Sequence, residues 1–211
     1  KYTFIGAGNV ATHLATALTR SGDTVLEIHS RSEAAGKALA RKTNARFVED
    51  LSRLNPNAGL FILAVPDDEI ANVLRSFPFP DRCVAHTSGA VPLNRFPARF
   101  TNAGVLYPLQ TLSKGVRIRW NNVPFCPEGR SEKVKRALRS PVKSLGAEAR
   151  WLDSDQRAWA HLAAVLVNNF SNHLFALAEE WLKKKGLGLE ILHPLMLETT
   201  RKAVKIGRAH V

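Results

Sequence analysis

Over residues 1–152, short apolar runs alternate with longer segments in which apolar residues recur at helical spacing. The run at 60–65 is apolar at every position, as expected of a parallel strand that is buried on both faces. The expected strands lie at 4–5, 24–30, 46–48, 60–65, 83–86, 104–107, 123–126 and 149–152, and the expected helices at 10–20, 33–41, from 67 onwards and around 133–139. This alternation predicts an α/β fold with a doubly wound parallel sheet.

The pattern changes at Asp153. From Ser154 to Lys185 the chain contains neither proline nor glycine, and apolar residues continue at helical spacing. Ser154 can cap the start of this long helix, and the lysines before Gly186 are typical of a helix end. A second helix is expected from about residue 189 or 194 to 203. We therefore expect a sheet domain at 1–152 and an all-helical domain at 153–205.

Both ends of the chain are unusual. The first residue, Lys1, already lies in the first predicted strand, and no initiator methionine precedes it. The last residues, 206–211, resemble a translated sequencing adapter. We expect a reading frame cut at both ends, an incomplete helical domain and a non-native tail at 206–211, which is left out of the fold prediction.

The charge of the chain indicates which kinds of partner it could bind. The formal net charge is +12, which would attract either nucleic acid or a phosphorylated cofactor. The densest basic stretch, 133–143, also carries an apolar stripe of Val134, Ala137 and Leu138. Its charges are therefore typical of the solvated face of a helix, and we expect no nucleic-acid partner.

The cysteines and the longest apolar runs bear on location. Cys83 and Cys126 lie far apart and form no C-x-x-C pattern. They are typical of small buried thiols in a reducing cytoplasm rather than of a disulfide or a metal site. No apolar stretch reaches the roughly 18 residues that suggest a membrane-spanning helix. We expect a cytoplasmic protein without a metal or a membrane partner.

The first predicted strand leads into a dinucleotide-binding fingerprint. Gly6, Gly8 and Ala11 form the pattern G-x-G-x-x-A between a strand and a helix, which is the context that the fingerprint requires. Gly6 permits a tight turn, and Gly8 lets the backbone approach a pyrophosphate. Asn9 and Val10 open the helix, whose free amides and partial positive charge favour phosphate.

The end of the second strand indicates which dinucleotide is bound. An NAD-binding chain places an acidic residue there to hold the ribose 2′-hydroxyl. This chain has Ser30, Arg31 and Ser32 instead, and a guanidinium with two hydroxyls suits a 2′-phosphate. Glu27 lies too early, inside the strand. We therefore predict NADP (NADPH); the alternative is that Arg31 is an ordinary exposed arginine.

Five segments together resemble a known family. They resemble bacterial proteins with a Rossmann-like domain and a C-terminal helical domain of unknown function, which are related to pyrroline-5-carboxylate reductase, prephenate dehydrogenase, and the 6-phosphogluconate and β-hydroxyacid dehydrogenases. The segments are Gly-Ala-Gly-Asn-Val-Ala at 6–11, Ala-Val-Pro-Asp at 64–67, His-Thr-Ser-Gly at 86–89, Tyr-Pro-Leu-Gln at 107–110 and His-Leu-Ala-Ala-Val-Leu-Val-Asn-Asn at 161–169. The resemblance covers essentially all of residues 1–205.

The resemblance implies further cofactor contacts. Ser30 and Arg31 match the pair that NADP-dependent relatives use at the 2′-phosphate. The turn that passes under the adenosine ribose and the pyrophosphate matches Val65 and Pro66, and the turn beside the nicotinamide matches Thr87, Ser88 and Gly89. All these turns are expected at the carboxyl ends of strands, where ligands bind in open α/β sheets.

The long helix carries polar side chains at unusual positions. His161, Asn168 and Asn172 fall within about 20° of one line on a regular helix, with Asn169 and His173 flanking that line. Burying such groups is costly unless they are hydrogen-bonded, so a polar stripe facing a cofactor cleft explains them. We take His161, Asn168 and Asn169 as candidate catalytic residues. A hydrogen-bond network between packed helices, or a dimer seam, is the alternative.

The related dehydrogenases differ from this chain at one important position. β-Hydroxyacid dehydrogenases carry a catalytic lysine four residues before an asparagine of the long helix, and Val165 stands there in this chain. Tyr107 and Gln110 could also reach a substrate, although Tyr107 is equally explained as a packed aromatic. His86 is either structural or functional, and His13 is interpreted as structural.

Two functions fit these features. One is an NADP-dependent reductase or dehydrogenase acting on a small carbonyl, imine or hydroxy-acid substrate, which the polar stripe on the long helix favours. The other is a non-catalytic NADP-binding sensor or regulatory protein, which the missing lysine favours. The related families also suggest a homodimer when the chain is full length.

Overall fold

The computed structural model describes residues 1–113 and 115–206. It divides the chain into two compact units, Lys1–Leu162 and Ala163–Val211, which are described separately below.

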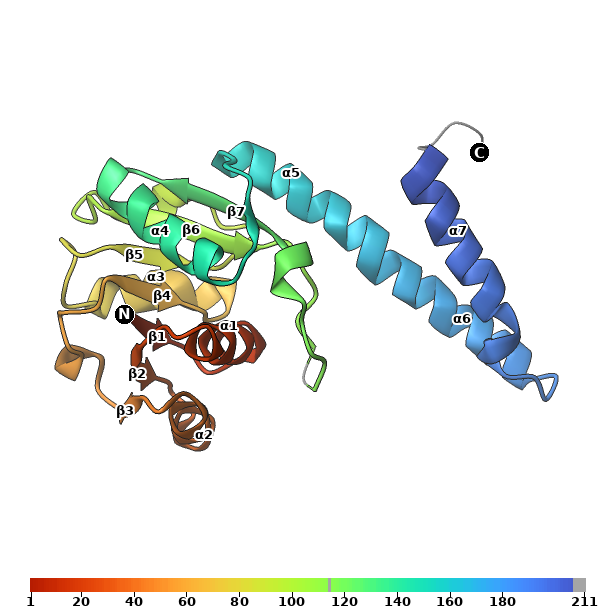
Figure 1. Cartoon of the computed structure of the whole chain (residues 1–211), viewed down its shortest axis with the longest axis horizontal. Coiled ribbons are helices and arrows are strands. Elements are labelled where there is room, and N and C mark those ends of the chain that lie inside the picture. The colour runs from red at the N-terminus through yellow and green to blue at the C-terminus, as the bar shows by residue number, and fades with distance from the viewer. Residues whose placement is uncertain (114, 207–211) are drawn as a thin grey trace. The chain divides into compact units, whose positions relative to one another are not determined.

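The first unit is built on an eight-stranded sheet with the order β3-β2-β1-β4-β5-β6-β7-β8 (Figure 1). Its strands are β1 (Tyr2–Ile5), β2 (Val25–His29), β3 (Arg46–Val48), β4 (Leu60–Leu63), β5 (Val84–His86), β6 (Ala103–Pro108), β7 (Pro124–Gly129) and β8 (Glu148–Ala149). The central strands β1 and β4 are buried at every position, which explains their continuous apolar sequence.

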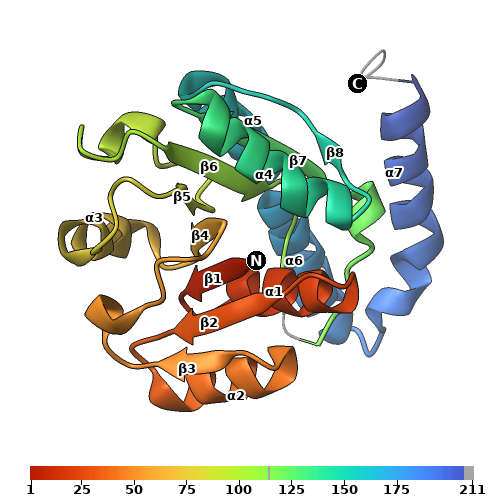
Figure 2. The same ribbon diagram turned by 60° about the vertical axis from the view of Figure 1, so that its left-hand side comes forward.

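Helices cover both faces of this sheet, as Figure 2 shows. They are α1 (Asn9–Arg20), α2 (Glu33–Thr43), α3 (Asp67–Ser76), α4 (Glu132–Ser144) and the start of α5 (Ser154–Val165). One apolar core joins α1, α2 and α4 to the sheet, and a second core joins α3 to the opposite face. The predicted α/β doubly wound fold is confirmed.

The sheet departs from the all-parallel prediction at β7, which pairs antiparallel with β6. Residues 109–123 connect these two strands with only a short 3₁₀ turn, Trp120–Asn122, among the described residues. Without a crossover helix the chain returns beside β6 in the opposite direction. The parallel arrangement resumes between β7 and β8, which α4 connects.

The predicted solvated face of α4 is confirmed. Val134 and Leu138 are buried in the core, whereas Lys133, Arg136 and Arg139 are exposed. Both cysteines are buried free thiols, as the sequence indicates.

The second unit is helical. It continues from the end of α5 through a π-helical turn, Leu166–Phe170, into α6 (Ser171–Lys183). A 3₁₀ turn, Leu189–Leu192, then precedes α7 (His193–Ile206). None of the residues 163–205 is fully buried. The predicted helices are therefore present, but the long one is not a regular α-helix.

The division between the units falls inside α5, whereas the predicted boundary of 152/153 coincides with the start of that helix. Of the proposed non-native tail at 206–211, residues 207–211 lie outside the described residues. Within the described part of the chain, no helix combines the length and the apolar character needed to cross a membrane.

Candidate active site

The turn after β1 forms a cradle suited to a pyrophosphate. Gly6 has a φ of +113°, and a Cβ at this position would lie 2.2 Å from the carbonyl oxygen of Ala64. Gly8 caps α1 without a side-chain hydrogen bond, and the first turn of α1 contains no acidic residue. A Cβ on Gly8 would meet no atom within 4 Å. No side chain caps the first amides of α1, those of Asn9 and Val10, and the space next to Gly8 is open. These residues therefore fit the pyrophosphate of a bound dinucleotide.

This cradle lies at the topological switch point of the sheet. β1 pairs with β2 on one side and with β4 on the other, both in parallel. The connections from β1 and β4 therefore diverge at the carboxyl ends of the strands, which is where open α/β sheets bind their ligands. Val65 and Pro66 follow β4 directly and belong to the same edge of the sheet.

At the end of β2, Arg31 is exposed and already has a partner. Its Nη1 lies 2.8 Å from Oε1 of Glu69, at the start of α3. The hydrogen bond from Asn72, followed by that from Arg31, lowers the pKa of Glu69. Ser32 caps α2 by accepting from the Ala35 amide at 3.4 Å. Sequence reasoning missed Glu69, because only the fold brings α3 next to the end of β2.

Glu27 has a structural role. It is 2% exposed and forms an ion pair with Arg46. Its second oxygen accepts from the Asn55 amide at 2.7 Å. These contacts tie β2 to β3 and to the following loop, so Glu27 is not available to a ribose.

The turn after β5 is ordered by its own side chains. Thr87 donates to the Leu63 carbonyl of β4 at 3.4 Å. The hydroxyl of Ser88 accepts from the amides of Ala90 and Val91 at 3.1 and 3.0 Å. Both side chains are buried and hold the turn in shape. The residue of this turn that closely approaches the Tyr107 and His161 rings is Gly89.

Gly89 lies against a pair formed by Tyr107 and His161. The hydroxyl of Tyr107, on β6, lies 2.9 Å from Nδ1 of His161, on α5. A Cβ on Gly89 would lie 2.8 Å from both rings. Burial raises the pKa of Tyr107 to about 12, so its hydroxyl stays protonated. Three of the candidate residues, separated in sequence, thus meet within the first unit.

Asn168 and Asn169 lie in the second unit, on the π-helical turn. The Asn168 amide donates to Oδ1 of Asn169 at 2.8 Å, and Asn172 donates to Oδ1 of Asn168 at 3.4 Å. The helical periodicity of the sequence places His161, Asn168 and Asn172 on one line of a regular helix; the π-helical turn interrupts the assumed rotation of about 100° per residue after Val165, while Asn172 still reaches Asn168. These side-chain amides bond to one another at the helix surface.

Three other polar residues have local structural contacts. His86 is fully buried and stacks on Phe96. Burial, and then the charge of Arg157, lower the pKa of His86 to about 3, so its imidazole is neutral. His13 bonds to the Ser113 carbonyl at 3.0 Å, as expected of a structural residue. Gln110 accepts from the neighbouring Thr111 amide at 2.8 Å.

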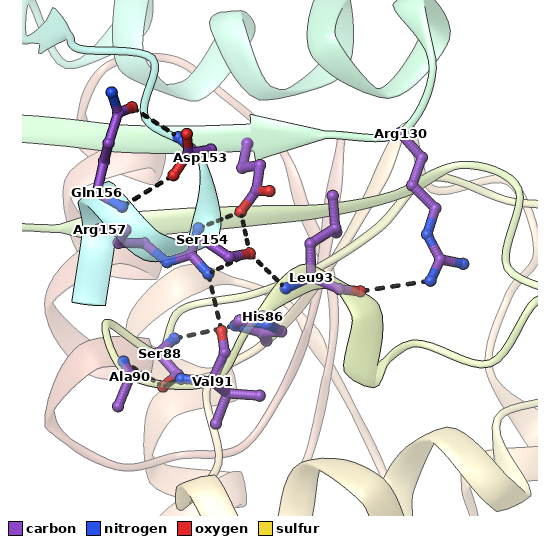
Figure 3. Close-up of polar contacts among 11 residues, drawn as sticks. His86, Ser88, Ala90, Val91, Leu93, Arg130, Asp153, Ser154, Gln156 and Arg157 are labelled. Atoms are coloured by element: carbon purple, nitrogen blue, oxygen red, sulfur yellow. Dashed lines mark hydrogen bonds and ion pairs between the residues drawn. The ribbon is translucent and has the colours of Figure 1, made fainter. Parts of the chain in front are cut away.

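A polar network behind the turn was not predicted (Figure 3). Arg157 is fully buried and pairs with Glu128 of β7. Asp153, not Ser154, caps α5, through a hydrogen bond from the Gln156 amide at 2.8 Å. The Ser154 hydroxyl instead donates to Glu128 and accepts from the Leu93 amide. In sequence a single arginine in a helix is most simply an exposed residue, and no local signal distinguishes this one.

Metal-ligating side chains do not gather in the part of the chain that the structure describes. No group of three or more His, Cys, Asp or Glu residues able to hold a metal ion occurs there. The polar features described at this edge of the sheet are the phosphate cradle and the Tyr107–His161 pair.

Comparisons with known proteins agree with this geometry. A Rossmann-like domain model matches residues 1–110, and the model of a domain of unknown function (DUF2520) matches residues 123–211. A candidate NADP oxidoreductase from Bacteroides fragilis is 36% identical, with a TM-score of 0.87, over 97% of this chain and 80% of its own.

More distant structures share the fold. A pyrroline-5-carboxylate reductase from Coxiella burnetii is 18% identical, with a TM-score of 0.71 over 99% of this chain and 81% of its own. A reductive aminase from Aspergillus terreus, solved with NADPH and ethyl levulinate, is 17% identical, with a TM-score of 0.80 over 98% of this chain and 74% of its own. No curated protein matches the chain. The chain belongs to the family of proteins that join a Rossmann-like domain to the domain of unknown function DUF2520.

Proposed function

We propose that this protein is an NADP-dependent oxidoreductase, which transfers a hydride to or from a small carbonyl, imine or hydroxy-acid substrate. The observation that carries the proposal is the Tyr107–His161 pair in contact with Gly89, at the turn expected beside the nicotinamide. The pair places a proton-exchanging group at the same strand edge as the dinucleotide cradle.

NADP is the dinucleotide that the residues and the similar proteins support together. The similar protein from Bacteroides fragilis is described as a candidate NADP oxidoreductase, and at 36% identity it shares the family of this chain. In this chain Arg31 is exposed at the end of β2, with Ser30 and Ser32 beside it. A guanidinium suits a 2′-phosphate dianion there. When bound, NADPH would supply the hydride.

His161 supplies the proton that must accompany each hydride. In the reductive direction its imidazolium gives the Nε2 proton to the substrate oxygen or nitrogen, and in the oxidative direction neutral Nε2 takes that proton back. In the imidazolium form Nδ1–H can only donate to the Tyr107 oxygen, so loss of the Nε2 proton leaves a neutral ring whose Nδ1–H keeps this hydrogen bond. In this scheme Tyr107 orients the ring with Nε2 as the reactive nitrogen.

Asn168 and Asn169 are proposed to orient the substrate by hydrogen bonding. They lie on a π-helical turn, a local irregularity that is frequent at functional sites. Their amides bond to each other at the surface, so both retain further donor and acceptor capacity for a ligand.

The test is a screen for NADPH oxidation with small ketones, 2-oxo acids and cyclic imines, followed by variants of the pair. His161→Gln is expected to lower turnover by about 10²-fold or more, the usual scale of general acid–base catalysis, with NADPH affinity nearly unchanged. Tyr107→Phe is expected to lower it less, since the imidazole remains. Unchanged turnover in His161→Gln would remove this residue from the mechanism.

A second function is favoured by one observation. The position of the relatives' catalytic lysine is Val165, the last residue of α5. A protein that binds NADPH tightly but turns over no member of the substrate panel would instead be a sensor or regulatory protein. Direct NADPH titration alongside the screen distinguishes the two functions.

We also propose that the protein forms a homodimer through its second unit. That unit has no fully buried residue between 163 and 205, and it exposes a set of large apolar side chains. These include Leu166, Val167, Phe170, Leu174, Trp181, Leu195 and Leu197. Helices with such surfaces need an apolar partner, and a second copy supplies a matching one.

A further inference from the structure

Arg157 is a buried charged residue for which the proposed chemistry has no direct use. It lies in the first turns of α5 and is 0% exposed. Arginine is almost never buried in this way unless it is paired. Its Nη1 donates to Oε2 of Glu128, and its Nη2 donates to the Val91 carbonyl at 2.8 Å. One guanidinium thus joins β7, the loop after β5 and α5 (Figure 3).

Stability alone does not explain such a pair. Removing two charges from water is costly, and apolar residues of similar volume often replace a buried ion pair without loss. A guanidinium, however, holds two acceptors in fixed directions, which neither a lysine nor an apolar side chain can do. The geometry that this fork fixes therefore explains the pair better than stability does.

The fork connects the two backbone segments that meet at the candidate site. Val91 follows Gly89 by two residues, and His161 follows Arg157 by four residues, one turn along α5. Gly89 and the His161 ring are in close contact. A small movement of α5 along the 87–89 turn would therefore either break this contact or cause a steric clash. Ser154 reinforces this register, because its hydroxyl accepts from the Leu93 amide at 2.9 Å and donates to Glu128 at 2.8 Å.

We propose that Arg157, with Glu128 as its counterion, is a positioning residue that holds His161 in register with Tyr107 and the 87–89 turn. It acts through His161 and makes no contact of its own with substrate. The inference rests on the proposed function only in taking His161 as the proton-exchanging group. The placement of the His161 ring can be measured without any substrate.

The test uses three variants. Arg157→Met combined with Glu128→Leu removes both charges, so no unpaired ion remains, but it also removes the bond to the Val91 carbonyl. Arg157→Lys keeps the charge and loses the fork. Arg130→Met is the matched control, because Arg130 donates to the carbonyls of Phe96, Pro97 and Phe100 in the same loop. Arg130 also donates to the Leu93 carbonyl at 3.4 Å, and among the described residues all four of its hydrogen-bond acceptors lie in this loop rather than on α5.

The readout is the tautomer of His161, from the ¹⁵N imidazole signals of histidine-labelled protein, assigned by their loss in His161→Gln. The parent and Arg130→Met are expected to show a single tautomer of His161, because one hydrogen bond to Tyr107 holds the ring. The double variant and Arg157→Lys, folded by circular dichroism, are expected to show a mixture of tautomers. A parent-like His161 signal in either folded variant would overturn the proposal.

A substrate, once found, gives a second readout. The Arg157→Lys variant is expected to lose about tenfold or more in kcat, on the scale of general acid–base catalysis, while its NADPH Kd stays close to that of the parent. If His161→Gln retains full turnover, the proposed chemistry fails, whereas the tautomer measurement still decides whether Arg157 positions the ring.

Discussion

Replacing Arg31 with alanine should weaken the binding of NADPH and leave that of NADH unchanged. Arg31 is the exposed guanidinium at the end of β2, and its Nη1 lies 2.8 Å from Glu69. A 2′-phosphate bound there would accept charge-assisted hydrogen bonds from the guanidinium. NADH has a hydroxyl instead of this phosphate, so the substitution should change the affinity for NADH very little.

The magnitude follows from what the guanidinium gains and what it gives up. Hydrogen bonds to charged groups are worth roughly 1.5–3 kcal/mol. The exposure of Arg31, 72% of its side chain, favours the lower end of that range because water screens the interaction. The pair with Glu69 must also loosen, although an exposed ion pair contributes little. The net loss is about 1–2 kcal/mol, or roughly 5–30-fold in Kd.

Glu69 provides the matched second variant. Its carboxylate competes for Arg31 and repels a 2′-phosphate, so Glu69→Gln should strengthen NADPH binding and leave NADH binding unchanged. Isothermal titration of both cofactors against the parent and the two variants, at low and high salt, measures these effects. Equal losses of NADPH and NADH in Arg31→Ala, or equal affinities in the parent, would refute the assignment of the 2′-phosphate site.

Four further outcomes are expected. Gly8→Val should leave the protein folded, because the new side chain meets no atom of the chain, but it should abolish NADPH binding by filling the space of the pyrophosphate. Gly6→Ala should instead destabilise the fold by about 2–4 kcal/mol, as measured by urea unfolding. His86 is buried and neutral with a pKa near 3, below its ordinary value of 6.5, so its contribution to stability is complete above pH 6.5 and is lost as the pH falls towards 3. Between pH 6.5 and 3 this one group changes the free energy of unfolding by up to about 1.4 kcal/mol per pH unit. His86→Phe should therefore make the free energy of unfolding less dependent on pH in this range, and an unchanged dependence on pH would contradict the burial argument. Sedimentation velocity should show a dimer that Leu174→Glu and Trp181→Glu convert to monomers, and a monomeric parent would refute the proposed interface.

Much of the first unit follows from its sequence. Continuous apolar runs such as Leu60–Leu63 identify buried parallel strands, and G-x-G-x-x-A identifies the first turn. The direction of β7 could not be predicted, because periodicity indicates a strand but not its orientation. The π-helical turn at Leu166–Phe170 was equally hidden, since no glycine or proline marks it.

The candidate site was only partly predictable. His161 was identified from an imidazole in an apolar helix, but its partner Tyr107 lies 54 residues away in sequence. Only the assembled fold, which brings α5 next to the end of β6, joins the two residues. Arg157 and Glu69 were missed for the same reason, because their partners Val91 and Arg31 belong to other elements. Sequence patterns report local periodicity and turn chemistry, whereas long-range pairing depends on the assembled sheet.

The most direct test of the central claim is a crystal structure of the protein with bound NADPH. We expect the pyrophosphate at the amides after Gly8, the 2′-phosphate at Arg31, and the nicotinamide beside Gly89, with Nε2 of His161 facing the space where a substrate would lie over the ring. A nicotinamide directed away from Gly89, or a His161 ring turned from that space, would contradict the proposed site.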